Sequence, residues 1–322
     1  MTSGAFAGLI LGGQLVLIAL DLLDSRRHRT EIYGADRLAV PAVAFLGVTI
    51  VVYGALQVAG LALVPTGEEL LASTQSALLR GGESAGFVAP PAALALSIGI
   101  LAFYAGGFWD YVVHRFVNHN RALWFTHEYH HLPTHVAVYM PGICVRPLAV
   151  VAVLPATAAT ILTVCLLLRA AGLEGLELAG VLHGVVLAQV TVLGTSHSAF
   201  LRRQPEVHRL LRPLGITTPQ EHWLHHARDL QGNFGNFTTI WDRLFGTYID
   251  PLDPANHGRR AGLNYDQDFL GALTLGRWKL PQRVRDYCRI GRYCHLEPPA
   301  IPAAPGARAP AESRPERLPA GR

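Results

Sequence analysis

The residues best suited to chemistry in this chain are its histidines, of which there are 15 among 322 residues. Many of them fall in three short clusters, DYVVHRFVNH, HEYHH and HWLHH. The clustered side chains are His114, His119, His127, His130, His131, His222, His225 and His226. Neutral imidazole is a good ligand for iron, copper, zinc and nickel. Eight imidazoles exceed the need of one metal ion, so the clusters predict a site for two.

The spacing within each cluster predicts how its imidazoles are presented. The second and third clusters share the pattern HxxHH. On an α-helix, positions i, i+3 and i+4 lie on one face, so all three imidazoles of a cluster can point into one site. His114 and His119 are separated by about 140° around an ideal helix. We therefore expect this pair where a helix ends or distorts.

The histidines outside the clusters are expected to have simpler roles. His197 follows GTS at the end of an apolar segment and is a candidate ninth ligand. His183 lies inside an apolar segment, and its role is left open. The others are expected to be surface groups or hydrogen-bonded core groups: His28, His135, His208, His257 and His295.

The elements that must position the clusters are long and apolar. Half of the residues are hydrophobic and only 16% are charged, whereas soluble domains carry roughly 25% charged residues. A spanning helix needs about 20 apolar residues. The segments that approach this length are 5–23, 38–64, 92–109, 147–168 and 178–196. The sequence therefore predicts an all-α, polytopic membrane bundle of about four to five spans, with a helical cytoplasmic cap that holds a histidine-rich di-metal site.

The distribution of arginine predicts the sidedness of the chain. Arginines concentrate in the loop after the first apolar segment, in 110–146 and in the C-terminal region. Because basic residues mark cytoplasmic loops, we expect the N-terminus outside, the C-terminus in the cytoplasm, and all three clusters on the cytoplasmic side. No basic stretch precedes the first apolar run, which argues against a cleaved signal peptide.

The same pattern predicts the organisation of the chain. The predicted units are transmembrane helices 1–3 in 1–109, a cytoplasmic segment with two clusters in 110–146, a transmembrane hairpin in 147–196, a cytoplasmic cap with the third cluster in 197–297, and a disordered tail in 298–322. Residues 68–80 are expected to form a short amphipathic helix.

Charge and cysteine content exclude other classes of protein. The net charge is +4, and no dense basic run with interleaved aromatic residues is present, so nucleic acid is not an expected partner. The four cysteines are scattered without CxxC spacing. A disulfide framework or a structural zinc knuckle is therefore not expected.

Three longer stretches carry a resemblance to a known family. The stretches are LWFTHEYHH, TTPQEHWLHH and NFGNFTTIWDRLFGTY. Together with the clusters, they resemble the three histidine boxes and the closing signature of the fatty acid hydroxylase/sterol desaturase superfamily. Members of this superfamily are membrane-bound di-iron enzymes. The resemblance covers roughly residues 100–250. It implies that the eight clustered histidines are metal ligands at the catalytic centre and that His197 is a further ligand.

The resemblance also touches polar and glycine positions near the boxes. Asp110, Asn233 and Asp242 match polar positions that could orient imidazoles. A helix cap or a turn is an equally good interpretation of these three residues. Gly235 and Gly246 are interpreted as turn residues.

The implied activity is the O2-dependent hydroxylation or desaturation of a lipid. The resemblance implies two iron ions, with zinc able to replace them in purified material, and O2 as co-substrate. The chain contains no GxGxxG fingerprint, so the electrons must come from a separate reductase such as a ferredoxin or a cytochrome b5-like protein. The lipid would enter from the bilayer, and a sterol, hopanoid, carotenoid, fatty acyl chain or alkylglycerol lipid would each fit. The oligomeric state is left open.

Two other functions compete with this interpretation. HEYHH contains the zinc-protease pattern HExxH, in which Glu128 would be the general base. An intramembrane metalloprotease would leave His130 and the third cluster unexplained. A metal transporter would place its ligands inside spanning helices, whereas these clusters lie outside the predicted spans.

Overall fold

The computed structural model describes residues 3–27, 51, 55, 63–79, 86–132, 136–138, 150–227, 231–259, 261–263, 265–268, 270–271 and 274–288. Within these ranges the chain is helical, with isolated β-bridges and no strand. The predicted all-α class is therefore confirmed for the described part of the chain.

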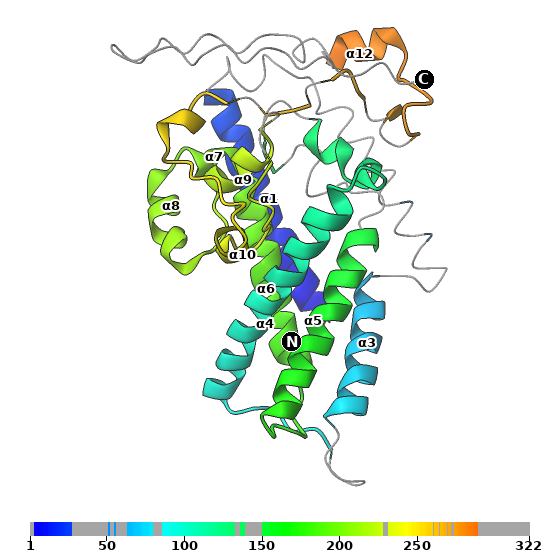
Figure 1. Cartoon of the computed structure of the whole chain (residues 1–322), viewed down its shortest axis with the longest axis vertical. Coiled ribbons are helices and arrows are strands. Elements are labelled where there is room, and N and C mark those ends of the chain that lie inside the picture. The colour runs from blue at the N-terminus through cyan, green and yellow to red at the C-terminus, as the bar shows by residue number, and fades with distance from the viewer. Residues whose placement is uncertain are drawn as a thin grey trace.

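The longest helices form a bundle. They are α1 (Ser3–Arg27), α3 (Leu63–Leu78), α4 (Ala92–Val113), α5 (Val150–Ala170) and α6 (Ala179–Ser196). Helix α4 packs between α5 and α6, α3 packs on α5, and α1 crosses α6 (Figure 1). The buried core between α3, α4, α5 and α6 consists of Leu71, Leu79, Ile98, Ala102, Ile161, Val164, Cys165, Leu168, Leu178 and Val185.

Three described helices are long and apolar enough to cross a membrane by length and composition. They are Ala92–Asn118, Ala152–Ala170 and Ala179–Ser196, which match the predicted segments 92–109, 147–168 and 178–196. The predicted segment 5–23 lies within α1, and its crossing of a membrane stays a prediction. The segment 38–64 lies almost wholly outside the described residues, as does the predicted tail 298–322.

Helices α4, α5 and α6 run in alternating directions, so α4 and α6 both end at the same end of the bundle. The beginning of α4, the end of α5 and the beginning of α6 meet at one end of the bundle (Figure 1). Two short connections pair there, since the Val88 N–H donates to the Gly175 carbonyl at 2.8 Å and the Glu177 N–H donates to the Val88 carbonyl at 2.8 Å. Residues His114 and His197, which follow α4 and α6, therefore share the opposite end. The predicted amphipathic helix 68–80 corresponds to the second half of α3.

Short helices and ordered loops cover that opposite end. They are α7 (Ala199–Arg202), α8 (Pro205–Leu211), α9 (Pro219–His225), α10 (Ile240–Leu244) and, further along, α12 (Gln282–Cys288). Helix α9 packs against α6, and α10 packs against α4. The Trp241 Nε1–H donates to the Tyr104 carbonyl at 3.0 Å, and the Tyr104 hydroxyl donates to the Leu214 carbonyl at 2.6 Å. These contacts fix the cap on the bundle.

Candidate metal centre

The first histidine pair lies where α4 widens into a π-helical turn. Residues His114–Asn118 form this turn, and the His119 N–H donates to the His114 carbonyl at 3.0 Å. A bond to the fifth preceding residue is the signature of a π-helix, which is frequent at functional sites. The wider turn brings residues five apart onto the same side. This confirms the expectation that the pair sits where a helix distorts.

The second cluster is built from 3₁₀ turns and not from an α-helix. Trp124–Thr126 and Glu128–His131 are 3₁₀ segments. Successive N–H groups donate to carbonyls three residues back, from Thr126 to Leu123 at 2.9 Å and from His130 to His127 at 2.9 Å. The expectation that an α-helical face carries all three imidazoles of this cluster into one site is therefore wrong. The tighter turn directs His127 and His131 to one side and His130 to the other.

The third cluster lies on α9, whose start is firmly capped. The Thr218 hydroxyl accepts from the Glu221 N–H, and the Glu221 carboxylate accepts from the Thr218 N–H at 2.9 Å, which completes a capping box. Pro219 occupies the first turn, where its missing N–H costs nothing. The cap fixes the rotation of this two-turn helix and therefore the direction of its three imidazoles.

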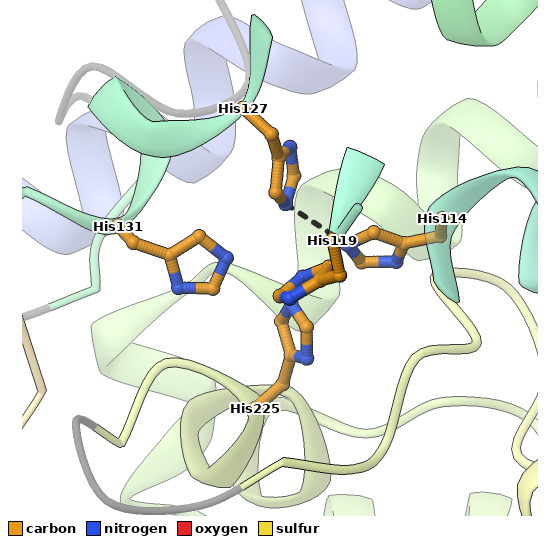
Figure 2. A group of neighbouring side chains, drawn as sticks. All are labelled: His114, His119, His127, His131 and His225. Atoms are coloured by element: carbon orange, nitrogen blue, oxygen red, sulfur yellow. Dashed lines mark hydrogen bonds between the residues drawn. The ribbon is translucent and has the colours of Figure 1, made fainter. Parts of the chain in front are cut away.

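All nine histidines predicted as ligands converge, in two adjacent groups. The five-histidine group contains His114, His119, His127, His131 and His225, and the four-histidine group contains His130, His197, His222 and His226. Within each group the nitrogen atoms that could bind a metal lie within 4.8 Å of one another. Figure 2 shows the rings of the five-histidine group turned toward a common centre. His197 is thereby placed with His222 and His226, whereas His225 joins the five-histidine group. Each HxxHH cluster therefore contributes to both groups, and the expectation that one cluster shares one site is wrong for the third cluster as well.

The distances between nitrogens suit metal coordination. The Nε2 atoms of His114 and His127 are 2.9 Å apart. In the four-histidine group, the His222 Nε2 lies 2.9 Å from that of His197 and 3.2 Å from that of His226. Ligands about 2.1 Å from one metal ion are separated by about 3.0 Å at right angles and about 3.4 Å in a tetrahedron. The observed spacings of 2.9–3.2 Å are close to this range, so neighbouring rings in each group are near enough to share one ion.

Burial keeps His119 and His131 neutral and leaves nitrogens that require a partner. Burial, together with the charge that His225 would carry, lowers the pKa of His119 to about 2. Burial and neighbouring histidines likewise hold the pKa of His131 well below its usual range. The Nε2 atoms of both side chains are buried and have no hydrogen-bond partner within the described residues. A buried polar atom without a partner is costly, and a metal ion would satisfy both.

Backbone carbonyls orient three of the rings. The Nδ1–H of His114 donates to the Phe234 carbonyl at 2.5 Å, that of His225 to Gly232 at 2.9 Å, and that of His197 to Leu193 at 2.8 Å. A proton held on Nδ1 leaves the Nε2 lone pair for a metal. These contacts therefore fix both the direction and the tautomer of one ring from each of three separate segments.

Two carboxylates, the buried Asp242 and the half-buried Asp110, hold the loop that supplies two of those carbonyls. Asp242 accepts from the Phe234 N–H at 2.8 Å and the Gly235 N–H at 2.9 Å. Asp110 accepts from the Asn236 N–H at 3.0 Å, and the Asn236 Nδ2 lies 3.2 Å from the His114 Nδ1. Burial raises the pKa of Asp242 to about 6, against the lowering effect of its hydrogen bonds. Asp110 and Asp242 thus support the five-histidine group through this loop.

Asn233 and the two glycines shape the same loop. The Asn233 amide donates to the Glu221 carbonyl at 3.0 Å and its oxygen accepts from the Ile249 N–H at 2.8 Å. Its φ of 51° is left-handed, a conformation that asparagine tolerates better than most residues. Gly246 has a φ of +71°, and a Cβ at Gly235 would lie 2.0 Å from the Thr238 carbonyl oxygen. Gly246 therefore occupies a turn as expected, whereas Gly235 lies where the backbone passes too close to Thr238 for a side chain.

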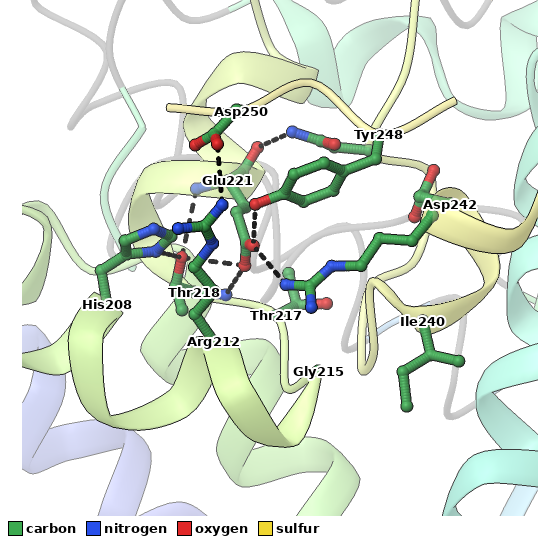
Figure 3. Close-up of polar contacts among 12 residues, drawn as sticks. His208, Arg212, Gly215, Thr217, Thr218, Glu221, Ile240, Asp242, Tyr248 and Asp250 are labelled. Carbon is green, nitrogen blue, oxygen red and sulfur yellow. Dashed lines mark hydrogen bonds and ion pairs between the residues drawn. The ribbon is translucent and has the colours of Figure 1, made fainter. Parts of the chain in front are cut away.

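Sequence reasoning missed Glu221, which anchors α9 from behind. The side chain is fully buried. It accepts from the Tyr248 hydroxyl at 2.8 Å and from Arg243 at 3.4 Å (Figure 3). The pattern T-x-x-E before HWLHH is a capping-box signal and could have identified it. Asn236 was also missed, and no sequence signal marks it.

Glu128 is hydrogen-bonded to side chains that belong to neither histidine group. Its buried carboxylate accepts from the Tyr265 hydroxyl at 2.5 Å and from the Gln267 amide at 3.2 Å. The Tyr265 oxygen in turn accepts from the Trp124 Nε1–H at 2.8 Å. A general base of a metalloprotease must reach the metal-bound water. This engaged carboxylate does not favour the protease alternative.

The remaining histidines lie outside both groups. His183 contacts Glu68 at 3.3 Å, His208 contacts the Thr218 hydroxyl at 2.9 Å, and His257 is exposed. His28, His135 and His295 lie outside the described residues.

An apolar groove of about 720 Å³ runs between α4 and α6. Its lining includes Leu96, Ile100 and Phe103 on α4 and Val181, Val185 and Val192 on α6. Tyr104 and Ile216 lie at the end nearer the cap. The two helices that form the groove are those that lead directly to His114 and His197.

A comparison with known proteins agrees with this site. Residues 99–247 match the model of the fatty acid hydroxylase family. The match begins in α4, ends after α10 and contains all nine converging histidines. No curated protein and no solved structure matches the chain significantly.

Proposed function

We propose that this chain, whose residues 99–247 belong to the fatty acid hydroxylase family of the fatty acid hydroxylase/sterol desaturase superfamily, is a membrane-bound di-iron enzyme that hydroxylates or desaturates a lipid with O2. The family implies an oxidoreductase. The observation that carries the proposal is the pair of adjacent, buried, all-histidine groups at the common end of two apolar helices.

The two groups define which residues would hold which ion. The five-histidine group would hold one ion and the four-histidine group the other. The His131 and His226 rings, one from each group, have centroids 4.5 Å apart, so the two sites adjoin. Iron bound there would supply the redox chemistry that activates O2.

The electron balance requires a partner. Reduction of O2 to the level of water takes four electrons, of which the lipid C–H bonds supply two in either hydroxylation or desaturation. The other two must come from an external donor. We propose a separate reductase, a ferredoxin or a cytochrome b5-like protein.

The chain's own residues prepare the site in two ways. Carbonyls of Phe234, Gly232 and Leu193 hold ring protons on Nδ1, so that Nε2 atoms stay available. Burial of eight of the nine rings excludes water from the centre, which protects a strong oxidant from side reactions.

The groove between α4 and α6 supports a lipid substrate. An acyl chain or polycyclic lipid in this groove would stay in apolar surroundings along the spanning helices while its reacting carbon approaches the end of the bundle that carries the histidines. We further propose that this end faces the cytoplasm, as the arginine distribution predicts.

The test is reconstitution of purified protein with ferrous iron under anaerobic conditions. A bilayer lipid extract, a chemical or protein electron donor and isotopically labelled O2 would then be added. We expect a lipid that gains one labelled oxygen atom or loses two hydrogen atoms. His222→Ala protein is the matched control and should yield neither product. Cleavage of a membrane-embedded peptide by zinc-loaded protein, with no lipid product, would contradict the proposal.

A further inference from the structure

A polar face of α1 contacts the end of α6 and the segment that follows it. Gln14, Asp21 and Asp24 interrupt the apolar sequence of α1 at spacings of seven and three, which places them on one helical face. The Gln14 amide donates to the Val190 carbonyl at 3.2 Å, and Asp24 pairs with Arg203 at 3.0 Å. Asp21 lies between these contacts. All three residues precede the region that matches the family.

Asp21 is fully buried and accepts four hydrogen bonds. Its Oδ1 accepts from the Ser198 hydroxyl at 2.6 Å and the Phe200 N–H at 3.0 Å. Its Oδ2 accepts from the Ala199 N–H at 3.1 Å and the Val138 N–H at 2.8 Å. A carboxylate offers two oxygens with about four acceptor sites, which matches this set of donors.

Three of the four donors come from the segment that directly follows His197 of the four-histidine group, and the fourth is Val138. Ser198 to Phe200 follow His197, and Val138 follows the second cluster, which contains His130. The Nε2 atoms of His197 and His130 are 3.5 Å apart. The Asp21 carboxylate thus joins the segment that follows His197 to Val138, which comes after His130 in the chain.

We propose that Asp21 is a positioning residue for the four-histidine group, which it holds through Ser198–Phe200 and Val138. The inference rests on the proposed function for the identity of the bound ion. The five-histidine group has a separate support, because its carbonyl partners lie in the loop held by Asp242 and Asp110. Loss of the Asp21 carboxylate should therefore disturb one group selectively.

The test compares Asp21→Asn with Asp24→Asn. Asparagine at 21 presents an amide nitrogen to backbone N–H donors. Asp24 lies on the same face but pairs with the side chain of Arg203, further along the chain from His197 than Ser198–Phe200. In chelator-treated protein, diethyl pyrocarbonate modification of each histidine is measured by peptide mass spectrometry. We expect several-fold higher reactivity of His197 and His130 in Asp21→Asn, with His225 unchanged. Asp24→Asn should resemble wild type.

Zinc titration provides the second readout. Asp21→Asn should bind its second zinc ion about 10- to 100-fold more weakly, the usual effect of losing a partner that orients a ligand. Ser198→Ala removes one of the four donors and should show the same pattern more weakly, which keeps the test informative if Asp21→Asn does not fold.

Two results would overturn the proposal: unchanged protection of His197 in Asp21→Asn, or an equal rise in reactivity of histidines in both groups. Failure of the proposed function has a different signature, in which wild-type protein binds no metal while the selective change in His197 and His130 reactivity is still observed.

Discussion

At the scale of single residues, the site is an arrangement of mostly buried imidazoles, three of which have their tautomer set by a backbone carbonyl. The histidine clusters identified eight of the nine converging residues, because their spacing can be read from the sequence, and His197 was expected separately from its place at the end of an apolar segment. The division into five and four could not be predicted. It depends on the 3₁₀ segment Glu128–His131, which has no strong sequence signal, and on the rotation of α9, which places His225 in one group and His222 and His226 in the other. The carbonyl partners from 232–234 also depend on a loop that only tertiary contacts define.

Two single-residue variants distinguish an oxygenase from a protease. Glu128→Gln retains an acceptor for the Tyr265 hydroxyl and leaves both histidine groups intact. We expect it to keep bound metal and most lipid oxidation, with a loss of at most about 2 kcal/mol in stability. His130→Ala removes a ring from the four-histidine group and should lose both an ion and activity. Metal analysis and the lipid assay check this pair of variants. Retained metal in both, with activity lost only in Glu128→Gln, would favour a hydrolase.

Asp242 offers a second test at the residue scale. Asp242→Ala removes the acceptor of the Phe234 and Gly235 N–H groups and frees the loop whose carbonyl orients His114. We expect about 10- to 100-fold weaker zinc binding at the five-histidine group, measured by titration. Asp250→Asn, which alters a half-exposed contact with Arg212, is the control. Equal effects of the two variants would show that the loop does not position His114.

At the scale of elements, apolar run length predicted the positions of α4, α5 and α6 well. A helix that is buried in a bundle or a bilayer needs a long run of apolar residues, and such a run can be recognised in the sequence. The π-turn at His114–Asn118 was predicted as a helix distortion, because His114 and His119 would lie about 140° apart around an ideal helix. The short cap helices were not resolved from sequence, because helices of one or two turns depend on capping and packing and not on periodicity.

The groove between α4 and α6 gives a prediction at this scale. Gly184 lines the groove, and a Cβ there would meet nothing within 4 Å. Gly184→Phe should therefore fill the groove without disturbing the fold. We expect kcat/KM for the lipid to fall about tenfold while metal content stays at the wild-type level. Val186→Phe, an exposed position of the same helix outside the lining, should have little effect. Equal activity of the two variants would place the lipid elsewhere.

At the scale of the whole molecule, the helix directions set the topology. The connection between α5 and α6, which contains Glu174, lies at the end of the bundle opposite to α12, the helix that Arg277 precedes in the chain (Figure 1). In a background with the native cysteines replaced, Glu174→Cys and Arg277→Cys should react with an impermeant maleimide from opposite sides of the membrane. Arg277→Cys should react only from the cytoplasmic side. Labelling of both from one side would contradict the topology.

The central claim is that the two histidine groups each bind one metal ion. The most direct measurement is the number of ions bound per purified chain, in wild type and in one variant of each group. We predict two ions in wild type and one in each of His127→Ala and His222→Ala, with iron in the active form. A single ion in wild type that survives His222→Ala would contradict the account, because the four-histidine group would then bind no metal.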